Sequence, residues 1–204
     1  MARPLVLACG ALVAELRAVL HSNGLAEQVE VRYLPANLHN RPARIVPALR
    51  ELLDELDPHR DRHVLIGYAD CGTGGQLDEL LAERSNLHRL PGNHCYEFYA
   101  GTPVFEALHE AELGTFFLTD FLAKHFEALI WQGLGLDRHP ELLPMYFGHY
   151  TRLVLLSQTD NPAVVQAAEA AAAQLGLRFE HVPVGLDPFA TAVTVGLTTS
   201  GKVS

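Results

Sequence analysis

The sequence lacks the short motifs that assign several common functions directly. No GxGxxG fingerprint opens the first expected helix, no GxxxxGK[ST] phosphate loop is present, and no GxSxG elbow occurs. These gaps count against dinucleotide-dependent, ATP-dependent and α/β-hydrolase enzymes. No apolar run approaches the roughly 18 residues of a membrane span, so we expect no interaction with a membrane.

Positive charge and cysteine are both scarce. The formal net charge of −9 argues against a basic nucleic-acid-binding face. Only Lys124 and Lys202 are lysines, which we attribute to composition bias of the genome rather than to function. The three cysteines are an odd number and form no CxxC pair. The first apolar stretch turns into an amphipathic helix pattern at Glu15 and Arg17, so no export signal is expected and the protein is predicted to be cytoplasmic. We therefore expect thiols or metal ligands rather than disulfides.

Strand-like apolar runs alternate with helical periodicity along most of the 204 residues. This alternation predicts a single α/β domain over residues 1–204, with an open, mostly parallel, Rossmann-like sheet and helices on both faces. The segment 103–150 is predicted to be a mostly helical insertion that forms a lid or side layer. After Asp187 we expect a loosely held tail. The expected strands lie within residues 4–9, 29–34, 63–69, 87–91, 151–158 and 179–185.

All three cysteines come directly after strand-like runs. Cys9, Cys71 and Cys95 follow the runs PLVLACG, HVLIGYADCG and LHRLPGNHCYE. If these strands are parallel neighbours, the three thiols emerge at the same edge of the sheet, where α/β proteins bind ligands. Any one cysteine is explained more simply as a small buried hydrophobe, but all three at strand ends favour a shared function.

Three thiolates indicate a soft metal ion as the ligand of such a site. With His94 as a fourth ligand they would close a tetrahedral zinc site, and with an open position they could hold catalytic zinc or a [4Fe–4S] cluster. Zinc is favoured because it is chemically simpler and tolerates oxygen. The flanking Gly10 and Gly72 are expected to let backbone N–H groups approach the bound group closely.

Further polar residues at the expected strand ends and in the insertion are candidates for catalysis. His39 and Asn40 lie in the loop NLHNRP, where the imidazole could be a ligand or a general acid or base. Asp120 in GTFFLTDF could orient a histidine or a ligand, although an ion pair with Lys124 also explains it. His149 in YFGHY is a further candidate, with packing an equal alternative.

The segments ACGAL, LHNRP, GYADCG, GNHCYE, GTFFLTDF and YFGHY together resemble the prokaryotic family catalogued as domain of unknown function 1638. The resemblance extends from residue 5 to about residue 160. Members of that family accompany corrinoid-dependent methyltransferases acting on quaternary amines, so the resemblance implies a corrinoid or methyltransferase protein as partner. The functional positions that it implies are Cys9, His39, Asn40, Cys71, His94, Cys95 and Asp120.

Three functions are consistent with these observations. The favoured one is a metal-dependent enzyme acting on a small molecule, such as a thiol or a methyl donor, with its Cys/His site at the carboxyl edge of the sheet. The second is a metal-free enzyme with Cys71 as nucleophile, activated by a helix N-terminus and a histidine. The third is a non-catalytic accessory or carrier protein of a methyltransferase system.

Overall fold

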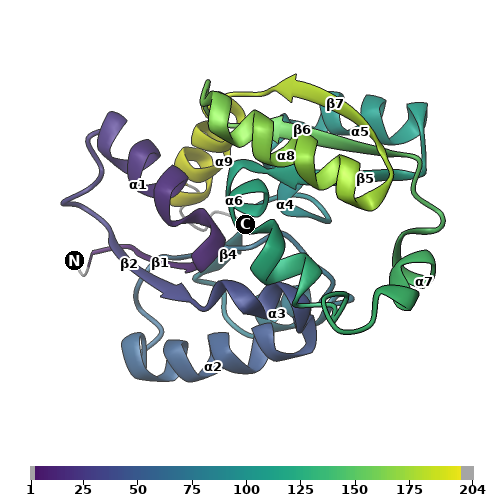
Figure 1. The fold of residues 1–204 in the computed structure, drawn as a ribbon. Coiled ribbons are helices and arrows are strands. Elements are labelled where there is room, and N and C mark those ends of the chain that lie inside the picture. The colour runs from purple at the N-terminus through teal and green to yellow at the C-terminus, as the bar shows by residue number, and fades with distance from the viewer. Residues whose placement is uncertain (1–2, 199–204) are drawn as a thin grey trace. The chain divides into compact units, whose positions relative to one another are not determined.

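The computed structural model describes residues 3–198, which divide into two compact units (Figure 1). The described residues up to Phe98 and those from Asp187 onward form the first unit, and Tyr99–Leu186 forms the second. Within residues 3–198, no helix combines the length and the apolar character that crossing a bilayer requires.

The first unit contains a four-stranded parallel sheet in the order β2-β1-β3-β4. Its strands are β1 (Leu5–Cys9), β2 (Glu30–Leu34), β3 (Val64–Gly67) and β4 (Leu87–Arg89). All of β3 and the first four residues of β1 are buried, which explains why these segments are continuous apolar runs without alternation. Because the strands are parallel, the four loops that follow them leave the same edge of the sheet.

Helices cover both faces of this sheet. On one face lie α2 (Ile45–Leu56) and α3 (Gln76–Ala82), and on the other lie α1 (Val13–Ser22) and α9 (Asp187–Thr198) (Figure 1). In α2, Ile45, Leu49 and Leu53 recur every four residues and are fully buried. This recurrence is the amphipathic pattern visible in the sequence.

The expectation of a loosely held tail after Asp187 is wrong for residues 187–198. They form α9, which buries Phe189 and Val193 and packs against α1 and β3. Gly196 allows the helix to come close, because a Cβ at this position would lie 2.6 Å from Leu65 Cδ1. The sequence pattern was misleading because α9 is rich in threonine and valine and contains Gly196, all weak helix formers. The rest of the predicted tail, residues 199–204, lies outside the described residues.

The second unit contains a three-stranded parallel sheet in the order β5-β6-β7. Its strands are β5 (Thr115–Thr119), β6 (Arg152–Ser157) and β7 (Arg178–Pro183). The central strand β6 is buried along its whole length, and the helices α6 (Asp120–Lys124) and α8 (Pro162–Leu175) pack against each other and against β6. The helices of this part of the chain are α4 (Cys95–Ala100), where the two units meet in sequence, α5 (Thr102–Ala111), α6 (Asp120–Lys124), α7 (Leu143–Phe147) and α8 (Pro162–Leu175).

The predicted α/β class, with parallel strands flanked by helices, is confirmed. Two details differ from the expectation: the strands form two sheets instead of one, and the segment 103–150 contains β5 in addition to helices. The run Thr-Phe-Phe-Leu-Thr of β5 consists largely of aromatic and β-branched residues, which favour strands. At five residues it is too short for its periodicity to distinguish a buried strand from a helix.

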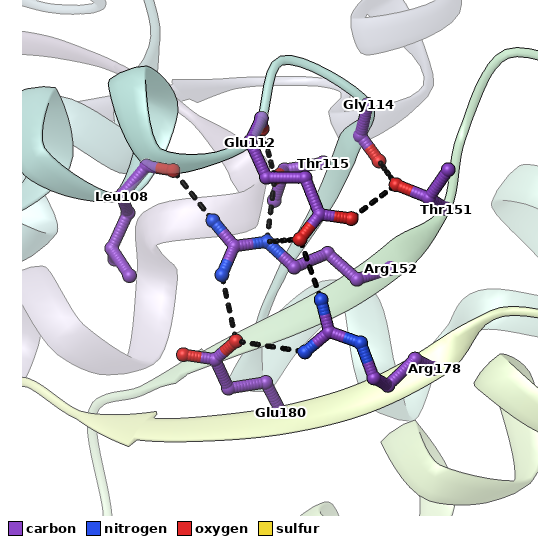
Figure 2. Close-up of polar contacts among 8 residues, drawn as sticks. All are labelled: Leu108, Glu112, Gly114, Thr115, Thr151, Arg152, Arg178 and Glu180. Atoms are coloured by element: carbon purple, nitrogen blue, oxygen red, sulfur yellow. Dashed lines mark hydrogen bonds and ion pairs between the residues drawn. The ribbon is translucent and has the colours of Figure 1, made fainter.

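An ion-pair network joins the amino ends of the strands in the second unit (Figure 2). Arg152, only 5% exposed, donates to Thr115 Oγ1 at 2.8 Å and to Glu180 Oε2 at 2.7 Å. It also donates to the Leu108 carbonyl at 2.5 Å and lies 3.4 Å from Glu112 Oε2. Arg152 therefore connects all three strands of this sheet with the last turn of α5.

A histidine pair in the first unit predicts pH-dependent stability. His63 and His88 stack with their ring centroids 4.8 Å apart, and His63 Nε2 bonds to the Gly196 carbonyl of α9 at 2.7 Å. Burial, and next the charge of His63, lower the pKa of His88. As pH falls, the unfolded chain therefore binds a proton at His88 before the folded chain does, and folding becomes less favourable.

We expect the free energy of unfolding to decrease between about pH 7.5 and about pH 5, and this decrease to be smaller in His88→Gln. Urea titrations followed by circular dichroism at both pH values measure the difference. His59→Gln is the control, because His59 is exposed in a turn of the same unit. An identical pH dependence in His88→Gln and the control would contradict the expectation.

Candidate functional site: a thiol cluster at the carboxyl edge of the first sheet

The three cysteines lie at the carboxyl ends of three adjacent strands. Cys9 is the last residue of β1, Cys71 lies in the loop after β3, and Cys95 begins α4 after β4. Since β1, β3 and β4 are neighbours in one parallel sheet, their loops leave the same edge. All three cysteines are free and half-buried. The structure thus places them as the strand-end argument expected.

The thiols are close enough to act on one another electrostatically. Burial is the largest cause that raises the pKa of all three, to about 12 for Cys71 and well above the ordinary value for Cys95. For Cys71, the next largest cause is the charge of Cys9. For Cys95, the next causes are the charge of Cys71 and then that of Cys9. Because charge interactions weaken with distance, these mutual effects identify Cys9, Cys71 and Cys95 as one cluster.

Backbone hydrogen bonds hold the loop after β3 against the loop after β4. The N–H of Asp70 donates to the Gly92 carbonyl at 3.1 Å, and that of Cys71 donates to the Asn93 carbonyl at 2.8 Å. Cys71 has φ of +51°, a left-handed conformation that costs a non-glycine residue on the order of 1 kcal/mol. Such conformations occur preferentially at functional sites, where the surrounding structure enforces them.

Asp70 stabilises the same loop from within. Its carboxylate accepts bonds from the Thr73 hydroxyl at 2.7 Å and from the N–H groups of Gly75 at 2.9 Å and Gly74 at 3.2 Å. Burial raises the pKa of Asp70, but these hydrogen bonds outweigh burial and lower it overall. Asp70 is therefore a charged anchor for the loop that carries Cys71.

The two glycines predicted to approach a bound group have packing roles. A Cβ at Gly10 would lie 2.8 Å from the Leu34 carbonyl oxygen, so glycine is needed where the chain after β1 passes the end of β2. Gly72 has φ of +80°, and a Cβ there would contact Pro42 at 3.5 Å. These contacts bring the loops of Cys9 and Cys71 against the loop after β2. A role of Gly10 and Gly72 in binding a cofactor stays a prediction.

His39 and Asn40 lie in that loop after β2, on the short helix η2 (Ala36–Asn40), and both are exposed. His94 is exposed in the loop after β4. Desolvation by the surrounding protein, and next the charge of His94, lower the pKa of His39, although the residue as a whole is exposed. The structure therefore brings His39 and His94 together, and a neutral His39 imidazole is favoured near neutral pH.

The cluster is not arranged as a ready-made coordination sphere. Across residues 3–198, no three or more His, Cys, Asp or Glu side chains converge as ligands of a metal ion. The thiols affect one another's pKa, but among the described residues they do not form such a ligand set. The ligand roles of Cys9, Cys71, Cys95 and His94 stay predictions.

A family model, described as a protein of unknown function (DUF1638), matches residues 33–193. The chain belongs to this family. The resemblance inferred from the sequence motifs is thereby confirmed, although the match begins after Cys9 and continues beyond residue 160. Neither the curated proteins nor the solved structures contain a significant match to this DUF1638 chain.

Sequence reasoning assigned no role to Tyr68, which lies beside the thiol cluster of this DUF1638 protein. Tyr68 directly follows β3 and is 3% exposed, and its hydroxyl lies beside the Cys9 thiol, so that each changes the pKa of the other. The hydroxyl nevertheless makes no hydrogen bond of acceptable geometry among the described residues. The only signal in the sequence was the position of a tyrosine at a strand end, within a run that reads as core.

Two candidates lie in the second unit. Asp120 begins α6 and is fully buried, and its carboxylate accepts bonds from the Gln158 N–H at 3.0 Å and the Thr159 hydroxyl at 2.5 Å. The Gln158 side chain in turn accepts the Asp120 N–H at 2.9 Å. These contacts connect α6 with the loop after β6, which is a structural role. His149 is exposed. Catalytic roles for Asp120 and His149 stay predictions.

Proposed function

We propose that this DUF1638 protein is a metal-dependent enzyme whose metal is held by the thiolates of Cys9, Cys71 and Cys95. The observation that carries the proposal is that three cysteines lie at or just after the carboxyl ends of three adjacent parallel strands. The effect of each thiol on the pKa of the others supports it. Zinc is the favoured metal and a [4Fe–4S] cluster is the close alternative, because both are bound by thiolates and can leave one position open to a substrate.

The electrostatics of the cluster favour a metal over the metal-free alternative. A cysteine nucleophile must be a thiolate, but burial and the neighbouring thiols keep Cys71 protonated at neutral pH. A bound metal cation would instead favour the deprotonated cysteines, because its positive charge stabilises the three thiolates. Metal binding would therefore be coupled to the release of protons from the cysteines.

The residues beside the thiols are suited to a reaction on a small molecule. When bound, zinc lowers the pKa of a coordinated thiol or water and so supplies a nucleophile. The His39 imidazole, neutral near pH 7 and exposed, could accept the proton that is lost, and the amide of Asn40 could orient the substrate. His94 either completes the metal's ligands or assists His39.

A place in corrinoid-linked methyl or thiol metabolism follows from the family resemblance alone. An accessory or carrier protein of a methyltransferase system is the non-catalytic candidate function, and the acidic net charge suits such a partner contact. Size-exclusion chromatography of the protein mixed with a purified corrinoid protein tests this candidate, because only a carrier or subunit would co-elute without substrate.

Metal analysis of protein purified under anaerobic conditions tests the proposal. We expect about one zinc per chain, whereas about four irons with acid-labile sulfide would identify the cluster. If neither metal is present, even after reconstitution with each, and one thiol reacts rapidly with iodoacetamide, the metal-free cysteine enzyme replaces the proposal.

A further inference from the structure

Tyr68 places a phenol ring in the core and its hydroxyl at the thiol cluster. The ring belongs to the buried cluster of the first unit, together with residues of β1, β3, α2 and α3, and Cys9 and Cys71 pack against the rim of the same cluster. Because Tyr68 is only 3% exposed, core packing fixes the position of its side chain. Tyr68 is thus held in place by the core of the first unit.

The Tyr68 hydroxyl is an unpartnered polar group in a buried position. Within the described part of the chain it has no hydrogen-bond partner, although buried hydroxyls nearly always have one. Its neighbour, the neutral Cys9 thiol, is only a weak acceptor. A thiolate at Cys9 would be a charged and much stronger acceptor for the same O–H group.

We infer that Tyr68 is a positioning residue of the metal site, whose hydroxyl donates a hydrogen bond to the Cys9 sulfur when that sulfur is a metal-bound thiolate. This inference rests on the proposed function. Hydrogen bonds to ligating atoms orient the ligands and tune the metal, and removing such a partner typically lowers metal affinity by a factor of about 10 to 100. On this inference, the Tyr68 hydroxyl gains its hydrogen-bond acceptor only when the metal is bound.

Tyr68→Phe tests the inference, with Tyr33→Phe as the matched control. Tyr33 lies on β2 of the same unit and also has a buried hydroxyl without a partner among the described residues, but the charge that acts on it is that of Arg17. Each protein is titrated anaerobically with Co²⁺, whose thiolate-to-metal charge-transfer band reports on the sulfur ligands. Zinc affinity is then measured by competition with a chelator.

We expect Tyr68→Phe to bind zinc about 10 to 100 times more weakly than the wild-type protein and to shift the charge-transfer band to lower energy. The hydrogen bond from Tyr68 stabilises the electron pair of the sulfur and so raises the energy of the charge-transfer transition. The variant lacks this bond, so its transition lies at lower energy. The Tm of the metal-free variant should be unchanged or higher, because the substitution removes only an unpartnered hydroxyl. A merely structural Tyr68 would lower the Tm and leave the band in place.

Two results would overturn the inference in distinguishable ways. If wild-type protein shows the charge-transfer band and Tyr68→Phe matches Tyr33→Phe in band position and affinity, Tyr68 has no role at the sulfur while the metal site stands. If wild-type protein shows no thiolate-to-cobalt band, the proposed metal site is itself wrong and the inference fails with it.

Discussion

Replacing Cys9, Cys71 or Cys95 by alanine, one at a time, is expected to reduce the bound metal from about one equivalent to near zero. Each substitution removes one of three thiolates, and the remaining two, with at most one histidine, form an incomplete site for zinc or a cluster. Metal content per chain, measured by mass spectrometry after anaerobic purification, gives the result directly.

The matched control for these variants is Ser85→Ala. Ser85 is exposed in the turn before β4, so the substitution removes a similar small polar group from the same unit. We expect its metal content to equal that of the wild-type protein. The far-UV circular dichroism of all four variants should remain that of the folded protein, because each cysteine is only half-buried. Full metal retention in all three cysteine variants would refute a shared ligand set.

Arg152→Met is expected to lower the free energy of unfolding of the second unit by about 1 to 3 kcal/mol. Methionine can occupy the space of the aliphatic part of the side chain, but it leaves the carboxylates of Glu112 and Glu180 with only the exposed Arg178 as a cationic partner (Figure 2). It also removes the donors to the buried Thr115 hydroxyl and to the half-buried Leu108 carbonyl.

Arg178→Met is the matched control from the same network. Arg178 donates to Glu112 at 2.5 Å, but its side chain is 59% exposed, and exposed ion pairs contribute only about 0 to 1 kcal/mol. Trp131 is the only tryptophan of the chain and lies in the second unit, so its fluorescence during urea unfolding reports on this unit. Equal destabilisation by both substitutions would show that burial of Arg152 does not determine its contribution.

The positions of the thiols were predictable because of a general property of parallel sheets. Apolar runs before Cys9, Cys71 and Cys95 indicated strands, and parallel strands carry their following loops to one edge. The proximity of His39 and His94 was less predictable. The sequence identified them as separate candidates, but whether they meet depends on how the loops after β2 and β4 fold.

Other features could not be predicted because they depend on contacts between distant segments. The five residues of β5 have no periodicity that separates a strand from a buried helix, and only pairing with β6 makes them a strand. The helix α9 returns to the first unit through Phe189 and Gly196, which no local pattern indicates. The unpartnered hydroxyl of Tyr68 is likewise visible only when its surroundings are known.

By itself, the amino-acid sequence determined the α/β class, the family and the set of strand-end residues, because these depend on local periodicity and on short motifs. Only the tertiary structure decided that the strands divide into two sheets, that the thiols act on one another and that Tyr68 stands beside Cys9. The physical reason is that burial and charge interactions depend on the distances between residues far apart in the chain, and only folding fixes these distances.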